Sequence, residues 1–375
     1  MLNRYLFFMV CITTIAIASV SKSSAVSYQI HNLGSIDENY CVSPLDINNK
    51  GEFVGVGYVP VHNGTGYYQH AFYWSQSTGM VDLSPTDSEA YSIGISMNGK
   101  IVGGRWNGDN YRAATWTPSG NMSLLPLLDG FNESSAVDVT ADGDVLGYLS
   151  NVVVETLSDG SLYRFTSHST NVIWHPDGTI ENLATSLPDH ADWTMRNINN
   201  NGWLIGSPDF SGYYGRMIKQ DGQVVVLPPI QGAGCPISIV YDLNDAGYAV
   251  GDTENHNHNT IAAKWDANGN LELLNPLSGC YNSVALGINN AGVVVGQSMG
   301  PGGRATYWDV DGAAHDLGAL EECNGGLARA INDNGWIVGV SGQYTVLWTP
   351  VPEPGSVISL LCGLMGIVIM RKCRN

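Results

Sequence analysis

Three aspartates recur at one equivalent position along the chain and could support acid–base chemistry. Asp46, Asp138 and Asp242 each stand directly before the apolar residue that opens a repeated motif. Two carboxylates about 5–9.5 Å apart can cleave a glycosidic bond, because one acts as acid and the other as base or nucleophile. These residues are therefore compatible with a polysaccharide-cleaving enzyme, if the fold brings the three aspartates to one place.

Aromatic residues in long, variable connections form a second set, and they point to binding. Flat aromatic faces can pack on sugar rings, and loops on a rigid scaffold are frequent binding sites. Exposed aromatic residues are also common in loops that bind nothing. The predicted ligand face consists of Tyr67, Tyr68, Trp106, Tyr111, Tyr213 and Tyr214.

Four of the seven cysteines lie between the two ends of the chain and could form disulfides. Cys41, Cys235, Cys280 and Cys323 each stand seven or nine residues before an asparagine of the repeat. Four cysteines in an exported chain allow three pairings. Pairing Cys41 with Cys323 and Cys235 with Cys280 joins only neighbouring repeat copies, and it would staple a closed ring.

Sequence motifs of metal-dependent and cofactor-dependent chemistry are missing. No Cys-x-x-Cys, His-Glu-x-x-His or phosphate-binding Gly-Lys-Ser/Thr sequence occurs. His256 and His258 share a polar loop without a placed carboxylate. The Asp-Gly pairs are typical of hairpin turns. We therefore expect no cofactor and no metal site.

The charge balance excludes one class of partner. The 375 residues carry 16 basic and 34 acidic side chains, a net charge of −18. Residues 26–350 alone keep 11 basic and 33 acidic side chains, a net charge of −22. A nucleic-acid binder needs a basic excess to neutralise phosphates, so no nucleic-acid partner is expected. Such a surface favours cations or neutral polymers.

The elements that must position these residues are seven copies of a repeat. Each copy reads apolar, Asn/Ser/Thr, two variable residues, Gly, one variable residue, two apolar residues and Gly. The polar position holds Asn48, Ser96, Thr140, Asn199, Asn244, Asn289 and Asn332. The second glycine is Gly55, Gly103, Gly147, Gly206, Gly251, Gly296 and Gly339. The polar residue and first glycine predict a hairpin turn, and the second glycine lets a neighbouring backbone approach closely.

A third strand, which ends in tryptophan, and a fourth strand follow each hairpin. The tryptophans are Trp74, Trp116, Trp174, Trp265, Trp308 and Trp348, and Lys219 takes this place in the fourth copy. Four strands in roughly 45 residues are typical of a propeller blade, with tryptophan as a wedge between blades. The third copy carries an insertion near residues 150–170, which predicts an extra hairpin.

The seventh copy ends without its fourth strand. Residues 28–34, before the first copy, match residues 315–318 in register. The sequence therefore predicts an all-β, closed seven-bladed β-propeller of four-stranded blades, in which the N-terminal strand completes the last blade.

Both ends of the chain are predicted to direct transport. Residues 1–25 combine a basic start, an apolar run and small residues, as in a secretory signal peptide. At the other end, Pro352, Glu353 and Pro354 precede an apolar stretch and a basic terminus. That stretch can enter a bilayer with the basic end in the cytoplasm, so a simple membrane anchor is one interpretation.

The order of Pro-Glu-Pro, apolar stretch and basic end resembles the PEP-CTERM sorting tail of exopolysaccharide-producing Gram-negative bacteria. The resemblance implies that an exosortase recognises Pro352, Glu353 and Pro354 within residues 351–375 and removes the tail after transient anchoring. The repeats resemble the HAF family of extracellular proteins, whose namesake tripeptide is His70-Ala71-Phe72. That resemblance covers residues 27–350 and implies secretion and a repeat fold, without a shared activity.

These observations favour an exported, non-enzymatic cell-surface or matrix protein whose propeller binds or organises exopolysaccharide. One alternative is a polysaccharide-cleaving enzyme that uses Asp46, Asp138 and Asp242 at the axis. Another is a scaffold that binds a different envelope protein. In each case the membrane is contacted only through the C-terminal tail.

Overall fold

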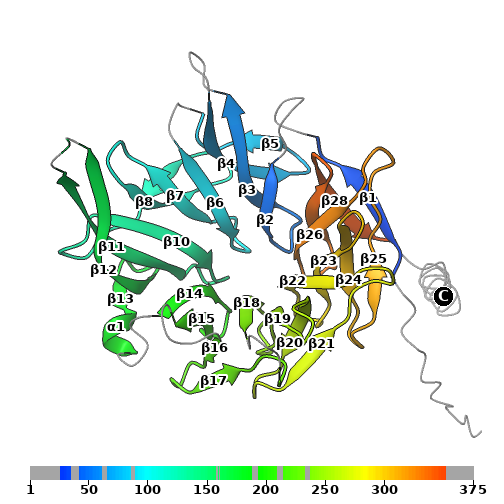
Figure 1. Ribbon diagram of the computed structural model, residues 1–375. Coiled ribbons are helices and arrows are strands. Elements are labelled where there is room, and N and C mark those ends of the chain that lie inside the picture. The colour runs from blue at the N-terminus through cyan, green and yellow to red at the C-terminus, as the bar shows by residue number, and fades with distance from the viewer. Residues whose placement is uncertain are drawn as a thin grey trace, which may run out of the picture.

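The strands of the chain form seven four-stranded antiparallel sheets around a central axis, as a computed structural model shows (Figure 1). The structure describes residues 26–34, 42–60, 66–85, 89–157, 159, 161–187, 193–208, 214–232 and 237–351. The predicted all-β, seven-bladed propeller is confirmed. The predicted signal peptide and the predicted sorting residues Pro352, Glu353 and Pro354 lie outside the described residues.

Each blade runs from an inner strand at the axis to an outer strand at the rim. Blade 1 consists of β2 (Ser43–Ile47), β3 (Phe53–Pro60), β4 (Tyr67–Ser75) and β5 (Gly79–Asp82). Blade 2 consists of β6 (Ala90–Ile95), β7 (Ile101–Trp106), β8 (Tyr111–Trp116) and β9 (Met122–Leu124). Blade 3 consists of β10 (Glu133–Val139), β11 (Val145–Thr156), β12 (Leu162–Trp174) and β13 (Ile180–Asn182), followed by the short helix α1 (Leu183–Ser186). Blade 4 consists of β14 (Trp193–Ile198), β15 (Leu204–Pro208), β16 (Gly215–Ile218) and β17 (Val224–Leu227).

The remaining blades repeat this order. Blade 5 consists of β18 (Ser238–Leu243), β19 (Ala249–Glu254), β20 (Thr260–Trp265) and β21 (Leu271–Leu274). Blade 6 consists of β22 (Asn282–Ile288), β23 (Val294–Met299), β24 (Arg304–Trp308) and β25 (Ala314–Asp316). Blade 7 consists of β26 (Gly326–Ile331), β27 (Ile337–Ser341), β28 (Tyr344–Pro350) and β1 (Tyr28–Asn32). The Asn-x-x-Gly turns lie on one face, here the turn face, and the connections between blades cross the opposite face, here the connection face.

The N-terminal strand closes the ring as the sequence predicts. β1 pairs with β28 as the outer strand of blade 7, from Tyr28 opposite Pro350 to Asn32 opposite Val346. The amide of Leu33 donates to the carbonyl of Thr345 (2.9 Å). Closure pairs the one strand edge that the last blade would otherwise leave open.

The ring closure also bears on the disulfide prediction. The hydroxyl of Thr345 donates to the carbonyl of Val42 (2.6 Å), and Val42 follows Cys41 in the chain. The thiol of Cys323 donates to the carbonyl of Ser341 (3.3 Å), at the other side of the same β27–β28 hairpin. Cys41 and Cys235 lie outside the described residues, and neither Cys280 nor Cys323 is bonded to a cysteine within the described ranges.

We therefore predict that Cys41 and Cys323 form a disulfide across the ring closure. Peptide mapping without reductant should recover one cross-linked peptide with Cys41 and Cys323, and another with Cys235 and Cys280. Cys323→Ser should lower the free energy of unfolding by about 2–4 kcal/mol, because the bond restricts the unfolded chain. The difference from wild type should vanish in reductant. Alkylation of Cys323 in the folded, unreduced protein would contradict the pairing.

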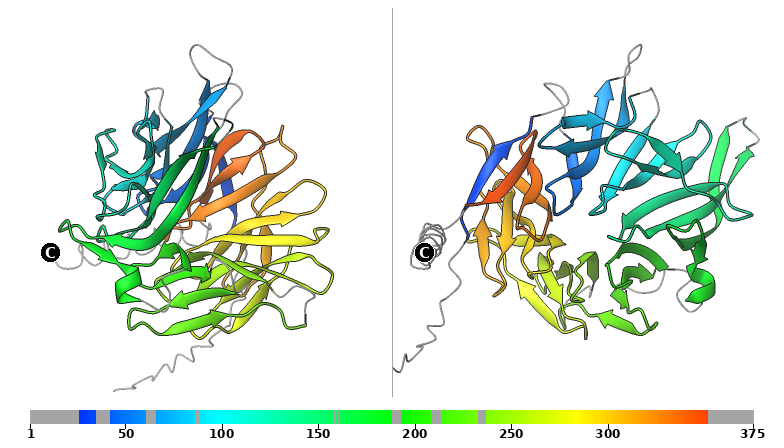
Figure 2. Two further views of the ribbon diagram at one scale, coloured as in Figure 1. Left: turned by 60° about the vertical axis from the view of Figure 1, so that its left-hand side comes forward. Right: turned by 180° about the vertical axis from the view of Figure 1, so that it is seen from behind.

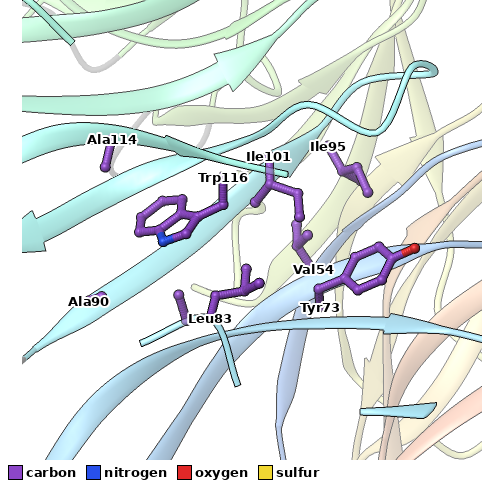
Figure 3. Packing of buried hydrophobic residues seen from close by; sticks show 9 residues of the cluster. Val54, Tyr73, Leu83, Ala90, Ile95, Ile101, Ala114 and Trp116 are labelled. Carbon is purple, nitrogen blue, oxygen red and sulfur yellow. The ribbon is translucent and has the colours of Figure 1, made fainter. Parts of the chain in front are cut away.

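Seven buried apolar clusters lie between neighbouring blades and hold the ring together. In the cluster between blades 1 and 2, Trp116 packs with Leu83 and Ala90 (Figure 3). Trp174, Trp265, Trp308 and Trp348 are equally buried in the matching clusters, which confirms these tryptophans as wedges. Trp74 differs, because it is only partly buried and stacks on Phe53 with ring centroids 5.2 Å apart.

The prediction for the fourth blade was wrong by one residue. Ile218 pairs with Leu204 and with Val224, so it occupies the position that tryptophan holds elsewhere. It is buried in the cluster between blades 3 and 4. Lys219 follows it at the start of the turn, with Nζ 5.5 Å from the ring centroid of Trp203.

A β-bulge interrupts the inner strand of every blade at the same place, and it explains the second glycine column. In blade 6 the pairing shifts between Ala285 and Gly287, so Leu286 is the extra residue. The bulge brings the carbonyl of Val284 against Gly296, where a Cβ would lie 1.9 Å from that oxygen. In all seven blades the corresponding distance is between 1.8 Å and 2.5 Å, so only glycine fits.

The insertion in the third copy lengthens the hairpin of β11 and β12, which contains a β-bulge between Asn151 and Val152. β11 and β12 stay paired from Val145 opposite Trp174 to Thr156 opposite Leu162. This hairpin stands beyond the rim of the ring (Figure 2). The extra hairpin is thus a continuation of two blade strands rather than a separate element.

Candidate functional site

The asparagines of the repeat close the turns and also link the blades. The side-chain oxygen of Asn244 accepts from the amide of Tyr248 (2.9 Å), within the same turn. Its amide nitrogen donates to the carbonyl of Asn289 in the next blade (3.0 Å). The same link joins Asn48 to Ser96, Asn199 to Asn244, Asn289 to Asn332 and Asn332 to Asn48. The structural interpretation of the asparagines is confirmed.

A second polar ring surrounds the mouth of the channel on the turn face. Its members are exposed or half-buried and bond to one another from blade to blade: Asn49, Asn200, Asp245, Asn290 and Asp333. The cavity behind them has a volume of about 190 Å³. Because these groups bond to one another across neighbouring blades, the ring stabilises the propeller.

The fold brings the three predicted aspartates together at the axis, where they form hydrogen bonds between blades. Asp46 accepts from the amide of Ile47 (2.7 Å) with one oxygen and from that of Ile95 in the next blade (2.7 Å) with the other. Asp138 accepts from Val139 (2.7 Å) and Ile198 (2.9 Å). Asp242 accepts from Leu243 (2.8 Å) and Ile288 (2.8 Å).

This arrangement follows from the bulges. Each bulge turns the amide of the next apolar residue toward the channel, where it needs an acceptor. Each carboxylate accepts from one amide of its own blade and one amide of the following blade, so three aspartates provide acceptors for the amides of six blades. In the seventh blade Ala330 holds the position. All six carboxylate oxygens are occupied by backbone amides, which favours a structural role for Asp46, Asp138 and Asp242.

Burial raises the pKa of all three carboxyl groups. The pKa of Asp46 rises to about 6, because burial outweighs the two amide hydrogen bonds. Burial, and then the charge of Asp46, raises the pKa of Asp138 well above its usual value. Burial likewise raises the pKa of Asp242. Between about pH 4 and pH 6, Asp46 therefore keeps a proton in the folded protein that it releases in the unfolded chain.

Asp46→Ala tests this titration. A raised pKa makes Asp46 contribute most to stability below about pH 4, and that contribution falls as pH rises toward 6. The difference in unfolding free energy between wild type and Asp46→Ala should shrink over this window by up to about 1.4 kcal/mol per pH unit. Urea titrations at pH 4.5, 5.5 and 7 measure it. A difference that grows with pH would contradict the shift.

A second axial cavity, of about 300 Å³, opens toward the connection face. The three aspartates and Asn197 line both axial cavities and separate them. The bulged residues of all seven blades line the second one: Leu45, Ile93, Val137, Arg196, Tyr241, Leu286 and Arg329. These bulged residues were not predicted from the sequence. Each stands two residues before the start of its repeat motif. Four of the seven are aliphatic, and the two arginines and the tyrosine that break this pattern were the available signal.

The arginines of this cavity are separated by blades 5 and 6. Arg196 is exposed at the cavity, and Arg329 is half-buried. Burial lowers the pKa of the Arg329 guanidinium. Burial, and then the charge of Asp252, raises the pKa of Tyr241 to about 12, so its phenol stays neutral. Both arginines act electrostatically on Tyr241, which places the three side chains in one electric field.

A lateral groove of about 370 Å³ lies between blades 2 and 3, and it contains two of the predicted ligand-face residues. Trp106 and Tyr111 meet edge to face, with ring centroids 5.1 Å apart. The lengthened hairpin supplies Phe165 and Arg164, whose guanidinium carbon lies 5.6 Å from the Trp106 ring centroid. Arg164 also lies 3.7 Å from Glu133. Aromatic faces and paired polar groups thus line one groove.

The other members of the predicted ligand face lie outside that groove. Tyr67 is 49% exposed and Tyr68 is half-buried, both at the start of β4. Tyr214 packs under Arg216, whose guanidinium carbon lies 5.8 Å from its ring centroid. Tyr213 lies outside the described residues.

The His-Ala-Phe tripeptide has a structural place. His70 is buried in β4, and its Nδ1 lies 2.8 Å from an oxygen of Asp82 in the outer strand β5. Arg304 makes the same link to Asp316 in blade 6. The tripeptide therefore marks a tie between the third and fourth strands of a blade.

Within the described ranges, no group of three or more His, Cys, Asp or Glu side chains has the arrangement to hold a metal ion. No helix in those ranges is long and apolar enough to cross a membrane.

Comparisons with known proteins bear on the fold. No family model matches the chain, and no curated protein matches it. Among solved structures, an oligogalacturonate lyase in complex with manganese aligns with a TM-score of 0.54 and 10% identity, over 88% of this chain and 95% of the lyase. An oligogalacturonate lyase from Vibrio parahaemolyticus aligns with a TM-score of 0.51 and 10% identity, over 88% of this chain and 98% of the lyase.

A third similar structure is the acylaminoacyl peptidase of Pyrococcus horikoshii. It aligns with a TM-score of 0.52 and 10% identity over 87% of this chain, which spans 55% of the peptidase. At such identities the likenesses show a shared propeller fold alone.

Proposed function

We propose that this chain is an exported, non-enzymatic cell-surface or matrix protein whose propeller binds polysaccharide through its connection face. The observation that carries the proposal is the lateral groove, in which Trp106, Tyr111 and Phe165 stand beside Arg164 and Glu133. Sugars offer apolar ring faces to aromatic side chains and hydroxyl groups to charged ones. The lengthened third-blade hairpin supplies one wall of this groove.

The axial aspartates support binding rather than cleavage. A glycosidase needs one carboxyl group that gives a proton and a second that attacks or activates water. Both oxygens of Asp138 already accept from the amides of Val139 and Ile198, and the other two aspartates are tied in the same way. An aspartate that gave up these hydrogen bonds to act on a substrate would leave amides of two blades without an acceptor. We therefore assign no catalytic role to the three aspartates.

Export and sorting belong to the same proposal and rest on the two chain ends. The signal-like residues 1–25 and the Pro352-Glu353-Pro354 tail support passage through the inner membrane, transient anchoring and transfer by an exosortase to the cell surface or matrix. Mass spectrometry of the mature chain tests this. A tail that remains attached in a producer with an active exosortase would contradict it.

Trp106→Ala is expected to weaken retention on insoluble polysaccharide by about tenfold or more, as loss of a central aromatic contact does. The experiment is co-sedimentation of the full chain, in mild detergent, with a panel that includes the producer's own matrix. Tyr67→Ala probes the second aromatic position of the same face.

The matched control is Tyr248→Ala, which removes an aromatic residue that is 38% exposed on the turn face. It should leave retention unchanged, and unfolding curves should show that all variants are folded. Equal loss in Tyr248→Ala and Trp106→Ala would overturn the groove as the binding site. Absence of retention on every polysaccharide would leave an envelope-protein scaffold as the better account.

A further inference from the structure

The axial cavity of the connection face holds two arginines that form no ion pair with any acidic residue that the structure describes. No carboxylate of the described residues lies within 4.0 Å of Arg196 or Arg329. In contrast, Arg164 reaches Glu133 and Arg304 reaches Asp316. Arg112 and Arg216 also lack such a partner among the described residues, but their guanidinium groups donate to backbone carbonyls.

The bulges place these arginines in the cavity. Arg196 and Arg329 are the extra residues of the inner strands of blades 4 and 7, and the bulge directs such a residue out of the regular alternation. Blades 1, 2, 3 and 6 place aliphatic side chains at this position. Most of the ring at this level is thus apolar, and the two guanidinium groups lie on different sides of it.

The floor of the cavity has the opposite character. Asp46, Asp138 and Asp242 separate it from the turn-face cavity. Each of their oxygens accepts one backbone amide, and one oxygen of Asp242 also accepts from the side-chain amide of Asn197 (3.0 Å). The other five oxygens have a further lone pair for another donor. The floor therefore accepts hydrogen bonds and repels anions when its carboxyl groups are ionised. Arg196 and Arg329 lie one residue farther from the turn face along their strands, and they donate hydrogen bonds and attract anions.

We propose that this cavity binds a sugar acid, with the carboxylate toward Arg196 and Arg329 and the hydroxyl groups toward the aspartate floor. The aliphatic walls suit the carbon face of the ring, and guanidinium groups are good partners for carboxylates. The proposal rests on the proposed function and deepens it, because it names uronate-containing polysaccharide as the ligand class. The polymer would extend from the axis toward the lateral groove on the same face.

A structural role of Arg329 is the competing explanation. Arg329 acts electrostatically on Asp242, so it could offset the negative charge at the floor. In that case Arg329→Gln would change stability and leave ligand binding unchanged. Arg196 is exposed and does not bury its charge, so Arg196→Gln should keep the fold and serves as the second variant.

Isothermal titration of the full chain, in mild detergent, tests the proposal. The ligands are D-glucuronate, D-galacturonate and D-mannuronate, each beside its uncharged methyl ester, with acetate as a carboxylate without a sugar. At least one uronate should bind ten times more tightly than its ester and than acetate. Arg329→Gln and Arg196→Gln should each weaken that binding at least tenfold.

Arg304→Gln is the matched control, because it removes the same charge from the outer part of blade 6. It should bind uronate like wild type. Equal affinity for uronate and ester, equal affinity for acetate, or unchanged binding in both cavity variants would overturn the proposal.

Co-sedimentation with the polysaccharide panel distinguishes two results: failure of the sugar-acid site alone, and failure of polysaccharide binding as a whole. Retention of the protein on neutral polysaccharide, without a preference for uronate, would overturn the sugar-acid site alone. Loss of all retention would overturn the proposed function as well.

Discussion

Gly296→Ala is expected to lower the free energy of unfolding by about 4 kcal/mol, a large fraction of the stability of a typical domain. The new Cβ would lie 1.9 Å from the carbonyl oxygen of Val284 and 3.0 Å from its carbon. That carbonyl belongs to the backbone of the neighbouring strand, so no side chain can move aside. Either β22 and β23 separate or the bulge at Leu286 is lost.

Gly292→Ala provides the matched control in the same blade. Gly292 has φ +85° and nothing within 4 Å of its added Cβ, so the substitution carries only the strain of a left-handed backbone. That strain is about 1–2 kcal/mol. Chemical denaturation of the two variants separates collision from strain. Equal losses, or a smaller loss in Gly296→Ala, would contradict the close approach at the bulge.

Asp138→Ala is expected to have the second-largest effect, a loss of about 3 kcal/mol in unfolding free energy. The carboxylate accepts from Val139 in its own blade and from Ile198 in the next. Its removal leaves two channel-facing amides without this acceptor and breaks one hydrogen-bonded link between blades 3 and 4. Asp138→Asn should fall between wild type and Asp138→Ala, because an amide offers one acceptor oxygen instead of two.

Asp311→Ala is the control for this prediction, because Asp311 is an exposed turn residue of blade 6. It should change the unfolding free energy by less than about 0.5 kcal/mol. Thermal and urea unfolding of the three variants give the comparison. A stable Asp138→Ala protein that has lost turnover of a polysaccharide would contradict the structural role and restore the enzymatic alternative.

The repeat columns made the architecture predictable. Complete glycine columns, such as the pair Gly51 and Gly55, fix a turn and a close backbone approach in every copy. The first glycine has a positive φ that favours glycine, and the second leaves no room for a Cβ. The displaced strand at residues 28–34 was predictable because Asn32, Leu33 and Gly34 repeat the hydrogen bonds of Asp316, Leu317 and Gly318. The local sequence pattern of these residues and their place as the outer strand of blade 7 are thus consistent.

The bulges were not predictable from the sequence, and the axial chemistry depends on them. A regular strand would place Arg196 and Asn197 on opposite faces of the blade, whereas the bulge lets both reach the axial cavity. The role of Asp46 was missed for the same reason, since its second amide partner, Ile95, is in another blade. Long-range partners of this kind follow from the ring geometry and leave no spacing signal in the chain.

The wedge of blade 4 shows a limit of motif alignment. The repeat alignment places Lys219 at the tryptophan position, but strand pairing places Ile218 there. An apolar neighbour one residue away was the available signal. The predicted aromatic ligand face is not one continuous surface, because only Trp106 and Tyr111 lie in the same groove. The other wall of that groove comes from the blade 3 hairpin.

The central claim is that the propeller binds polysaccharide without cleaving it, and the molar mass of a bound polymer tests this most directly. A soluble uronate-containing polysaccharide is incubated with the full chain in mild detergent and analysed by size-exclusion chromatography with light scattering. The account predicts that protein elutes with the polymer and that the molar mass of the polymer stays unchanged. A falling polymer mass, or protein that elutes alone, would contradict it.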